Sequence, residues 1–350
     1  MQNEDGVRKE SQVLTERLSP LEPRFYPLSE TRDLGNAICR EAGLEVSALE
    51  ERVFEGGEFK LRPLDSVRGR VAFVLQSLAG SPGLSVADRF VRLLFFLNGL
   101  RDAGAREVVA IVPYLAYARK EQRTQLRDPV NSRYVAQLIE ASGAHRVITV
   151  DVHNPAALDN AFRIPVDHLT AVPMMAAHIA RRLGTRDLVV VSPDMGGLKR
   201  VQLVQEALAA TLERPVELAL VEKRRSKGVV SSGRIIGEVA GRVALIVDDL
   251  CATGGTLIRA ADKCREADAL AVHVAVTHAP LAAGLASVAS AESVTEVVVT
   301  DSAGTHALPS TSAAKVHTLS IAPLIGQAVR RMLAGEPVAP LLTLAPDAIP

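Results

Sequence analysis

Short runs of valine, isoleucine and leucine alternate with longer amphipathic stretches along almost the whole chain. In each run nearly every position is apolar, which is typical of a strand covered by helices on both faces of a parallel sheet. The stretches between the runs carry apolar residues at helical spacing. This order predicts an α/β fold with mainly parallel sheets flanked by helices. The expected strands are 71–76, 108–113, 147–150, 188–191, 216–221, 243–247, 272–277 and 297–300, and clear helical patterns cover 88–103, 132–142 and 256–266.

An internal repeat indicates two related halves. Residues 69–83, GRVAFVLQSLAGSPG, match residues 241–255, GRVALIVDDLCATGG, and a helical pattern followed by a valine-rich run comes after both copies. Duplication of one α/β unit is the simplest explanation, and chance similarity of two strand–turn–helix segments is the alternative. Only the second copy contains adjacent acids, Asp248 and Asp249. We therefore expect the chemistry in the second half, with the first half in a supporting role.

The repeat and the ends of the chain suggest domain boundaries. We expect one domain at 24–168 and a second at 169–334, whose last helix is a candidate to pack back on the first. Residues 1–23 form a polar extension without the apolar stretch of a secretion signal. Residues 335–350 contain four prolines, which predicts a tail that trails over the surface.

Composition excludes several classes of protein. The 40 lysines and arginines balance 40 aspartates and glutamates, so no net charge favours nucleic acid or an anionic membrane as a partner. Eight phenylalanines, four tyrosines and no tryptophan are too few for a base-stacking platform. The uncharged stretch 269–291 is rich in alanine and serine, and we interpret it as a buried strand and a helix rather than a membrane span.

Three cysteines, Cys39, Cys251 and Cys264, form no CxxC pair, and their odd number argues against a disulfide framework. We expect a protein of the reducing cytoplasm. The sequence also lacks a Walker A loop, a GxGxxG turn after a strand, a zinc-type His/Cys spacing and a GxSxG nucleophile elbow.

The strongest chemical signal is the segment 247–256, VDDLCATGGT. A strand delivers Asp248 and Asp249 to its carboxyl end, and a glycine-containing turn then opens a helix. Gly254 and Gly255 allow a tight turn whose amides can surround a phosphate at the positive end of the helix. The neighbouring carboxylates can accept hydrogen bonds from vicinal hydroxyls or hold Mg²⁺. The segment therefore predicts a site for a phosphorylated sugar, with an ordinary strand–helix turn as the alternative.

This segment resembles the phosphoribosyl-pyrophosphate-binding loop of type I phosphoribosyltransferases and of ribose-phosphate diphosphokinases. Four further segments resemble the diphosphokinases in their order and spacing: PYLAYAR at 113–119, DVH at 151–153, VSPDMGG at 191–197 and EKRR at 222–225. The resemblance extends from about residue 25 to residue 333. It implies two tandem type I phosphoribosyltransferase-like domains, since simple phosphoribosyltransferases are shorter and lack the duplication.

The family resemblance also implies a reaction and a set of site residues. The reaction is transfer of the diphosphoryl group of ATP to the 1-hydroxyl of ribose 5-phosphate, with Mg²⁺, by a homo-oligomer (a dimer or a hexamer). Catalysis is assigned to Lys223 and Arg225, which lie in a basic flap that can close over polyphosphate. The ribose 5-phosphate site is assigned to Asp248, Asp249, Ala252, Thr253, Gly254, Gly255 and Thr256. The ATP site is assigned to Phe54, Glu58, Arg119, Lys120 and His153, and the metal site to His153 and Asp194. Phe54 and Glu58 resemble a hairpin that reaches the adenine of a neighbouring subunit.

Three positions and one segment depart from the family pattern. Ala252 stands where diphosphokinases usually carry a third acid, Lys120 replaces the usual glutamine, and Arg92 replaces an acid. Residues 154–160 do not match the family's segment after the histidine. Two alternatives therefore stay open beside the diphosphokinase: a non-catalytic regulatory paralogue of that enzyme, and a nucleobase phosphoribosyltransferase.

Overall fold

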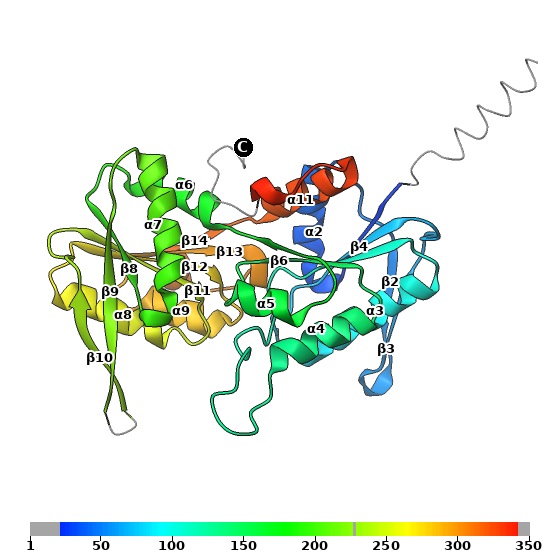
Figure 1. Cartoon of the computed structure of the whole chain (residues 1–350), viewed down its shortest axis with the longest axis horizontal. Helices are drawn as coiled ribbons and strands as arrows, with labels where there is room; N and C mark the ends of the chain where they lie inside the picture. The colour runs from blue at the N-terminus through cyan, green and yellow to red at the C-terminus, as the bar shows by residue number, and fades with distance from the viewer. Residues whose placement is uncertain (1–21, 227–228, 342–350) are drawn as a thin grey trace, which may run out of the picture.

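Two β-sheets follow one another along the chain in the computed structural model, which describes residues 22–226 and 229–341, with only the backbone described within 223–232 (Figure 1). The first sheet has the order β1-β4-β5-β6-β7, and all its pairings are parallel. Its strands are β1 (Arg24–Pro27), β4 (Val71–Leu75), β5 (Glu107–Ile111), β6 (Arg146–Val150) and β7 (Val166–Leu169). An antiparallel hairpin of β2 (Leu49–Val53) and β3 (Phe59–Pro63) lies between β1 and β4 in the sequence.

The second sheet has the order β10-β9-β8-β11-β12-β13-β14, and only the pairing of β9 with β10 is antiparallel. Its strands are β8 (Leu188–Ser192), β9 (Glu217–Ser226), β10 (Val229–Ile236), β11 (Val243–Leu250), β12 (Ala271–His278), β13 (Glu296–Thr300) and β14 (Val316–Leu319). The arrangement β8-β11-β12-β13-β14 repeats that of β1-β4-β5-β6-β7, and the repeated segments contain the equivalent strands β4 and β11. The internal repeat in the sequence therefore corresponds to a repeated sheet.

All eight strands expected from the sequence are confirmed, with ends that differ by a few residues. Within these two sheets, the strands β1, β7, β10 and β14 were not expected. Each lies at the edge of a sheet, and β1, β7 and β14 have only four residues. Edge strands therefore lack the long apolar run that identifies a central strand.

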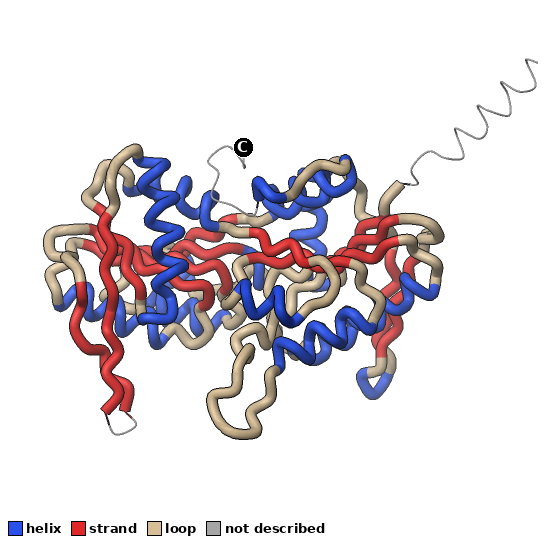
Figure 2. Tube along the Cα trace, in the orientation of Figure 1, coloured by secondary structure: helices blue, strands red, loops and turns tan. Residues whose placement is uncertain are grey.

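Helices cover both faces of the sheets, and Figure 2 shows the strands as a band between them. One core cluster joins a face of each sheet to α2 (Arg32–Ala42), α6 (Val172–Leu183), α7 (Leu198–Leu212) and α11 (Ala322–Ala334). The other face of the first sheet packs against α3 (Val86–Asp102), α4 (Asn131–Ala141) and α5 (Pro155–Ala161). The other face of the second sheet packs against α8 (Gly255–Glu266) and α9 (Ala282–Ser290).

Short helical elements complete the described chain: α10 (Ser310–Ala313), η1 (Ser29–Thr31), η2 (Glu55–Gly57), η3 (Met195–Gly197), η4 (Asp301–Ala303) and η5 (Ala339–Leu341). The uncharged stretch 269–291 forms β12 and α9, as expected. In the described chain, no helix is long and apolar enough to span a bilayer.

The last long helix, α11, packs against α2 near the beginning of the chain, which the sequence suggested (Figure 1). The contact is close because Gly326 has no side chain: a Cβ there would lie 2.4 Å from Cβ of Glu41. Similarly, α6 follows the first sheet in the sequence and packs against α7, beside the second sheet. The packing of α11 on α2 and of α6 on α7 therefore fixes the two sheets relative to each other.

The carboxyl ends of strands from both sheets meet at one junction. His278, at the end of β12, places Nε2 3.0 Å from the carbonyl oxygen of Val150 and Nδ1 2.7 Å from Oγ of Ser302. Thr277 donates a 2.7 Å hydrogen bond to Oδ2 of Asp151, which follows β6. In open α/β sheets, ligands bind outside the carboxyl ends of the strands. The junction is therefore where a functional site is expected.

Candidate active site

The phosphate-loop segment 251–254 connects β11 to α8 in the way the sequence predicted. Gly254 has φ +80°, a left-handed conformation that glycine adopts at little cost. Among the described residues, none accepts a hydrogen bond from the backbone amides of Thr253, Gly254, Gly255 or Thr256. These donors lie at the positive end of α8, so they can receive an anion such as a phosphate.

Helix α9 supports this loop from behind. A Cβ on Gly284 would lie 1.8 Å from the carbonyl oxygen of Ala252, so the loop backbone lies directly against α9 at this point. A Cβ on Gly254 would lie 2.5 Å from a methyl group of Val288, also in α9. The small residues of α9 thus set the position of the loop, a contribution that the sequence analysis missed.

The acid pair at the end of β11 is held by one cation and one imidazole. Nη1 of Arg200, in the first turn of α7, lies 2.9 Å from Oδ1 of Asp248 and 3.1 Å from Oδ1 of Asp249. Nδ1 of His153 lies 2.7 Å from Oδ2 of Asp249. His153 follows the first sheet, whereas Asp249 belongs to the second. The predicted ATP and metal residue therefore contacts a predicted ribose residue across the junction.

Burial and these partners separate the pKa values of the two acids. Burial raises the pKa of Asp248 to about 7, and the adjacent Asp249 adds to the effect. Burial also opposes ionisation of Asp249, but the hydrogen bond with His153 and the charge of Arg200 outweigh it and hold its pKa below the ordinary value. The hydrogen bond with Asp249 raises the pKa of His153. At neutral pH Asp249 is therefore ionised, whereas the carboxyl group of Asp248 is close to its pKa and exchanges its proton readily.

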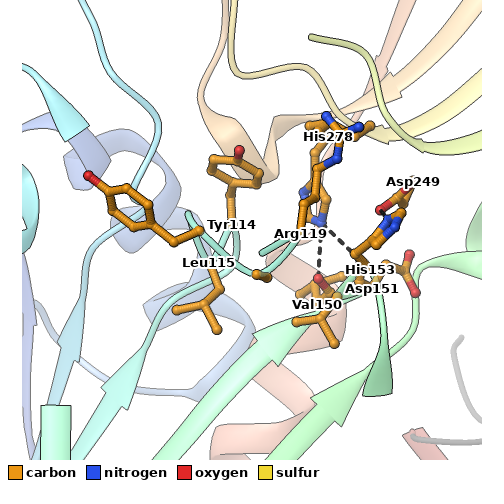
Figure 3. Close-up of a pocket in the computed structure, with 12 residues that line it drawn as sticks. Tyr114, Leu115, Arg119, Val150, Asp151, His153, Asp249 and His278 are labelled. Atoms are coloured by element: carbon orange, nitrogen blue, oxygen red, sulfur yellow. Dashed lines mark hydrogen bonds and ion pairs between the residues drawn. The ribbon is translucent and has the colours of Figure 1, made fainter. Parts of the chain in front are cut away.

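A small cavity of about 70 Å³ lies beside this cluster (Figure 3). Its lining includes Tyr114, Arg119, Asp151 and His278, with His153 and Asp249 at one side. Pockets for drug-sized ligands usually enclose about 300–1,000 Å³, so a whole nucleotide does not fit inside. The cavity suits one phosphate group or a hydrated cation, with the rest of a nucleotide outside it.

Lys120 and Asp194 lie in turns that their own side chains stabilise. Nζ of Lys120 lies 3.1 Å from Oδ2 of Asp128, so this predicted ATP residue is already paired with an acid of its own loop. Oδ1 of Asp194 accepts hydrogen bonds from the amides of Gly196 and Gly197. Asp194 therefore engages both of these amides in the glycine turn of segment 191–197.

Phe54 and Glu58 stand apart from the His153–Asp249 cluster. They close the β2–β3 hairpin, where the amide of Phe54 donates to the carbonyl oxygen of Glu58 at 2.7 Å. The hairpin, labelled β2 and β3, lies at the far end of the first sheet from the second sheet (Figure 1). Within one chain the structure therefore does not bring these two predicted ATP residues to the cluster.

Lys223 and Arg225 lie on the distal part of β9, which pairs with β10. Their side chains lie outside the described part of the structure. The backbone forms an antiparallel ribbon at the edge of the second sheet, so the two residues lie within a strand and not after the strand expected at 216–221.

Sequence reasoning missed Arg200 completely. The signal was available, because Arg200 follows the glycine turn at 196–197 and the first turn of a helix after a parallel strand faces the same sheet edge as Asp248. His278 was also missed, since its role depends on Val150 and Asp151, which are distant in the sequence.

Known proteins resemble this chain over nearly its whole length. A family model described as the N-terminal domain of ribose phosphate pyrophosphokinase matches residues 24–143, and one described as a phosphoribosyl synthetase-associated domain matches residues 206–343. A ribose-phosphate pyrophosphokinase from Maricaulis maris is 39% identical over 310 residues, which cover 88% of this chain and 96% of the relative. Another from Caldanaerobacter subterraneus is 36% identical over 312 residues, covering 89% and 94%.

A solved structure shows the same similarity. The crystal structure of phosphoribosylpyrophosphate synthetase from Mycobacterium smegmatis matches with a TM-score of 0.78 at 31% sequence identity, covering 90% of this chain and 100% of that one. The similarity therefore extends over both sheets and is not limited to the phosphate-loop segment.

Proposed function

The chain belongs to the ribose-phosphate pyrophosphokinase family, and from this premise we propose that it transfers the diphosphoryl group of ATP to the 1-hydroxyl of ribose 5-phosphate. The products are 5-phosphoribosyl 1-pyrophosphate and AMP. One observation carries the proposal: a loop with unengaged amides lies beside an acid pair, and that pair contacts His153 from the other sheet at 2.7 Å. The loop amides proposed for the phosphate, the acid pair proposed for the sugar hydroxyls and the imidazole of His153 therefore lie at one junction.

The second sheet supplies the sugar site in this proposal. The amides of residues 253–256 bind the 5-phosphate, and Asp248 and Asp249 accept hydrogen bonds from the 2- and 3-hydroxyls. Ala252 lies in the same loop and contributes backbone only. Fixing the ring at both ends aims the 1-hydroxyl at the incoming β-phosphorus, which is how enzymes make phosphoryl transfer effectively unimolecular.

The first sheet supplies the nucleotide site. His153 and Arg119 line the cavity and face the phosphates of ATP, and Lys120 directly follows Arg119 in the sequence. The 1-hydroxyl oxygen forms a bond to the β-phosphorus and its proton is released to water, while the bond from that phosphorus to the α,β-bridging oxygen breaks and its electron pair leaves with AMP. Lys223 and Arg225 offset the charge on the transferring group and on the departing AMP.

Mg²⁺ is the metal we propose for this site. In the described chain no group of three His, Cys, Asp or Glu side chains is ready to hold a metal ion. That agrees with Mg²⁺, which keeps several waters and usually binds one or two carboxylates together with substrate phosphates. The acid pair, His153 and Asp194 are the residues that would hold it, and it would neutralise phosphate charge.

We also propose that the protein acts as a homo-oligomer in the cytoplasm. Apolar side chains are exposed on the β2–β3 hairpin and on α3, including Phe54 (39% exposed) and Phe95 (62% exposed). Arg92 braces this region, since its guanidinium lies over the ring of Phe59 and near Glu30 and Glu51. Such a patch favours burial against a second copy, as a dimer or hexamer would provide, and would bring Phe54 and Glu58 to a neighbour's ATP.

The cysteines support the cytoplasmic part of this proposal. All three are buried and unpaired, as suits a reducing compartment.

A single assay tests the reaction. The purified protein is incubated with ATP, Mg²⁺ and ribose 5-phosphate, and we expect AMP and phosphoribosyl pyrophosphate in equal amounts. Ligand binding without AMP formation would instead identify a non-catalytic regulatory paralogue. Consumption of phosphoribosyl pyrophosphate that depends on an added nucleobase would identify a phosphoribosyltransferase. The family membership favours the first outcome.

A further inference from the structure

Arg259 lies beside the phosphate-loop segment, although no motif in the sequence pointed to it. It is the fifth residue of α8, and its side chain is exposed. Its Nη2 atom lies 3.4 Å from Oγ1 of Thr256. A Cβ on Gly255 would lie 3.2 Å from Nη1 of Arg259. The guanidinium therefore folds back over the beginning of the helix, towards the loop amides.

The space over Gly255 explains why a glycine suits that position. Gly255 is not among the residues with positive φ, so its backbone does not require glycine. Instead, a side chain there would meet the guanidinium of Arg259 at a distance that forces one of them to shift. Glycine at 255 therefore leaves room for Arg259 beside the loop.

No acidic side chain balances the positive charge of Arg259 at the beginning of α8 in the described part of the chain. No acid lies in the first turn of α8, and in the described part of the chain Arg259 has no carboxylate within ion-pair distance. Two other cations already have acidic partners, since Arg200 contacts the acid pair and Lys263, four residues further along α8, contacts Glu266. A guanidinium next to the positive end of a helix is unfavourable unless an anion binds between them. A phosphate dianion fits, because arginine binds phosphate through two parallel hydrogen bonds.

We propose that Arg259 is a substrate-binding residue that clamps the 5-phosphate of ribose 5-phosphate against the loop amides. This inference rests on the proposed function, because it adds a side chain to the sugar site proposed above. Its consequence is specificity: Arg259 strengthens binding of the phosphorylated sugar and contributes nothing to binding of the same sugar without its phosphate. It acts at the end of the sugar remote from the transferred group.

The test compares Arg259→Leu and Arg259→Lys with the unaltered protein. In steady-state assays, Arg259→Leu should raise the KM for ribose 5-phosphate roughly tenfold, the scale of one charge-assisted hydrogen bond. The KM for ATP should change less than twofold, and Arg259→Lys should recover part of the loss. Lys263→Leu is the matched control, since it removes a cation four residues further along α8, away from the loop.

Calorimetry separates this inference from the proposed function. Binding of ribose 5-phosphate and of ribose is measured for each variant without ATP, and only the phosphorylated sugar should bind less tightly to Arg259→Leu. If the protein forms no AMP but this difference appears, the clamp stands and the reaction proposal falls. If the protein forms AMP but Arg259→Leu binds both sugars as the unaltered protein does, or loses affinity for both equally, the clamp is overturned.

Discussion

The Nδ1 atom of His153 lies 2.7 Å from Oδ2 of Asp249, and this contact joins the end of the first sheet to the end of the second. The two residues are predicted to serve different substrates. Their contact means that the nucleotide and sugar sites share a boundary, as direct transfer of a diphosphoryl group requires.

Asp249→Asn should lower the pKa of His153 towards the ordinary value near 6.5, because the hydrogen bond to the carboxylate is the largest cause of its raised pKa. The same variant should lose about 100-fold or more in kcat/KM for ribose 5-phosphate, the scale of one lost transition-state contact. Histidine NMR titration measures the first effect and steady-state kinetics the second. An unchanged His153 titration would contradict the contact.

Arg200→Met should damage the sugar site and the fold together. Its side chain is 17% exposed and balances two largely buried carboxylates, so its loss leaves them unpaired. Breaking a buried pair in this way typically costs about 3–5 kcal/mol of stability. The loss here should be smaller, because the arginine keeps some solvent contact. We expect a lower melting temperature and a raised KM for ribose 5-phosphate, with partial recovery in Arg200→Lys. A variant with both values unchanged would show that the bridge is dispensable.

Gly284→Ala should displace the phosphate-loop segment, because the new Cβ would lie 1.8 Å from the carbonyl oxygen of Ala252. Overpacking of this kind typically costs about 1–3 kcal/mol, and the moved amides should weaken binding of ribose 5-phosphate at least tenfold. The control is Gly99→Ala in α3, where a Cβ meets nothing within 4 Å. That variant should gain up to about 1 kcal/mol of stability and keep its activity. Equal behaviour of the two variants would contradict the role of α9.

Lys223→Ala should lower kcat by about 100-fold, because it removes one cation from the charge that develops on the transferring group. The KM for ribose 5-phosphate should change little, since in our proposal the loop amides bind the 5-phosphate and Lys223 acts on the transferring group. Steady-state assays at saturating ATP measure both values. Unchanged turnover would remove the basic segment from the mechanism.

The central strands and the phosphate-loop segment could be predicted because their signals are local. A buried parallel strand needs an unbroken apolar run, and a phosphate cradle needs glycines directly after a strand. Segment 247–256 satisfies both conditions within ten residues. The match of residues 69–83 to residues 241–255 then predicted the same strand–turn–helix unit in the first sheet.

The partners of the acid pair could not be predicted in the same way. Arg200 and His153 reach Asp249 only because two sheets meet end to end, and that meeting depends on the packing of α6 on α7 and of α11 on α2. Gly284 is similar, since a glycine in an alanine-rich helix carries no sign of the loop that lies against it. Contacts across such sequence distances need the three-dimensional arrangement.

His168 makes the loop before His153 sensitive to acid. Its Nε2 atom accepts a 2.8 Å hydrogen bond from the amide of Val152, so this nitrogen must be unprotonated, and burial lowers the pKa of His168 further. The unfolded chain takes up a proton at this residue near pH 6.5, whereas the folded protein resists it until a lower pH. The free energy of unfolding therefore falls as the pH drops below about 6.5, by up to about 1.4 kcal/mol per pH unit. We expect His168→Leu to have a lower melting temperature than the unaltered protein at pH 7.5, and the gap to narrow by pH 5.5. Parallel melting curves across this range would contradict the acceptor role of His168.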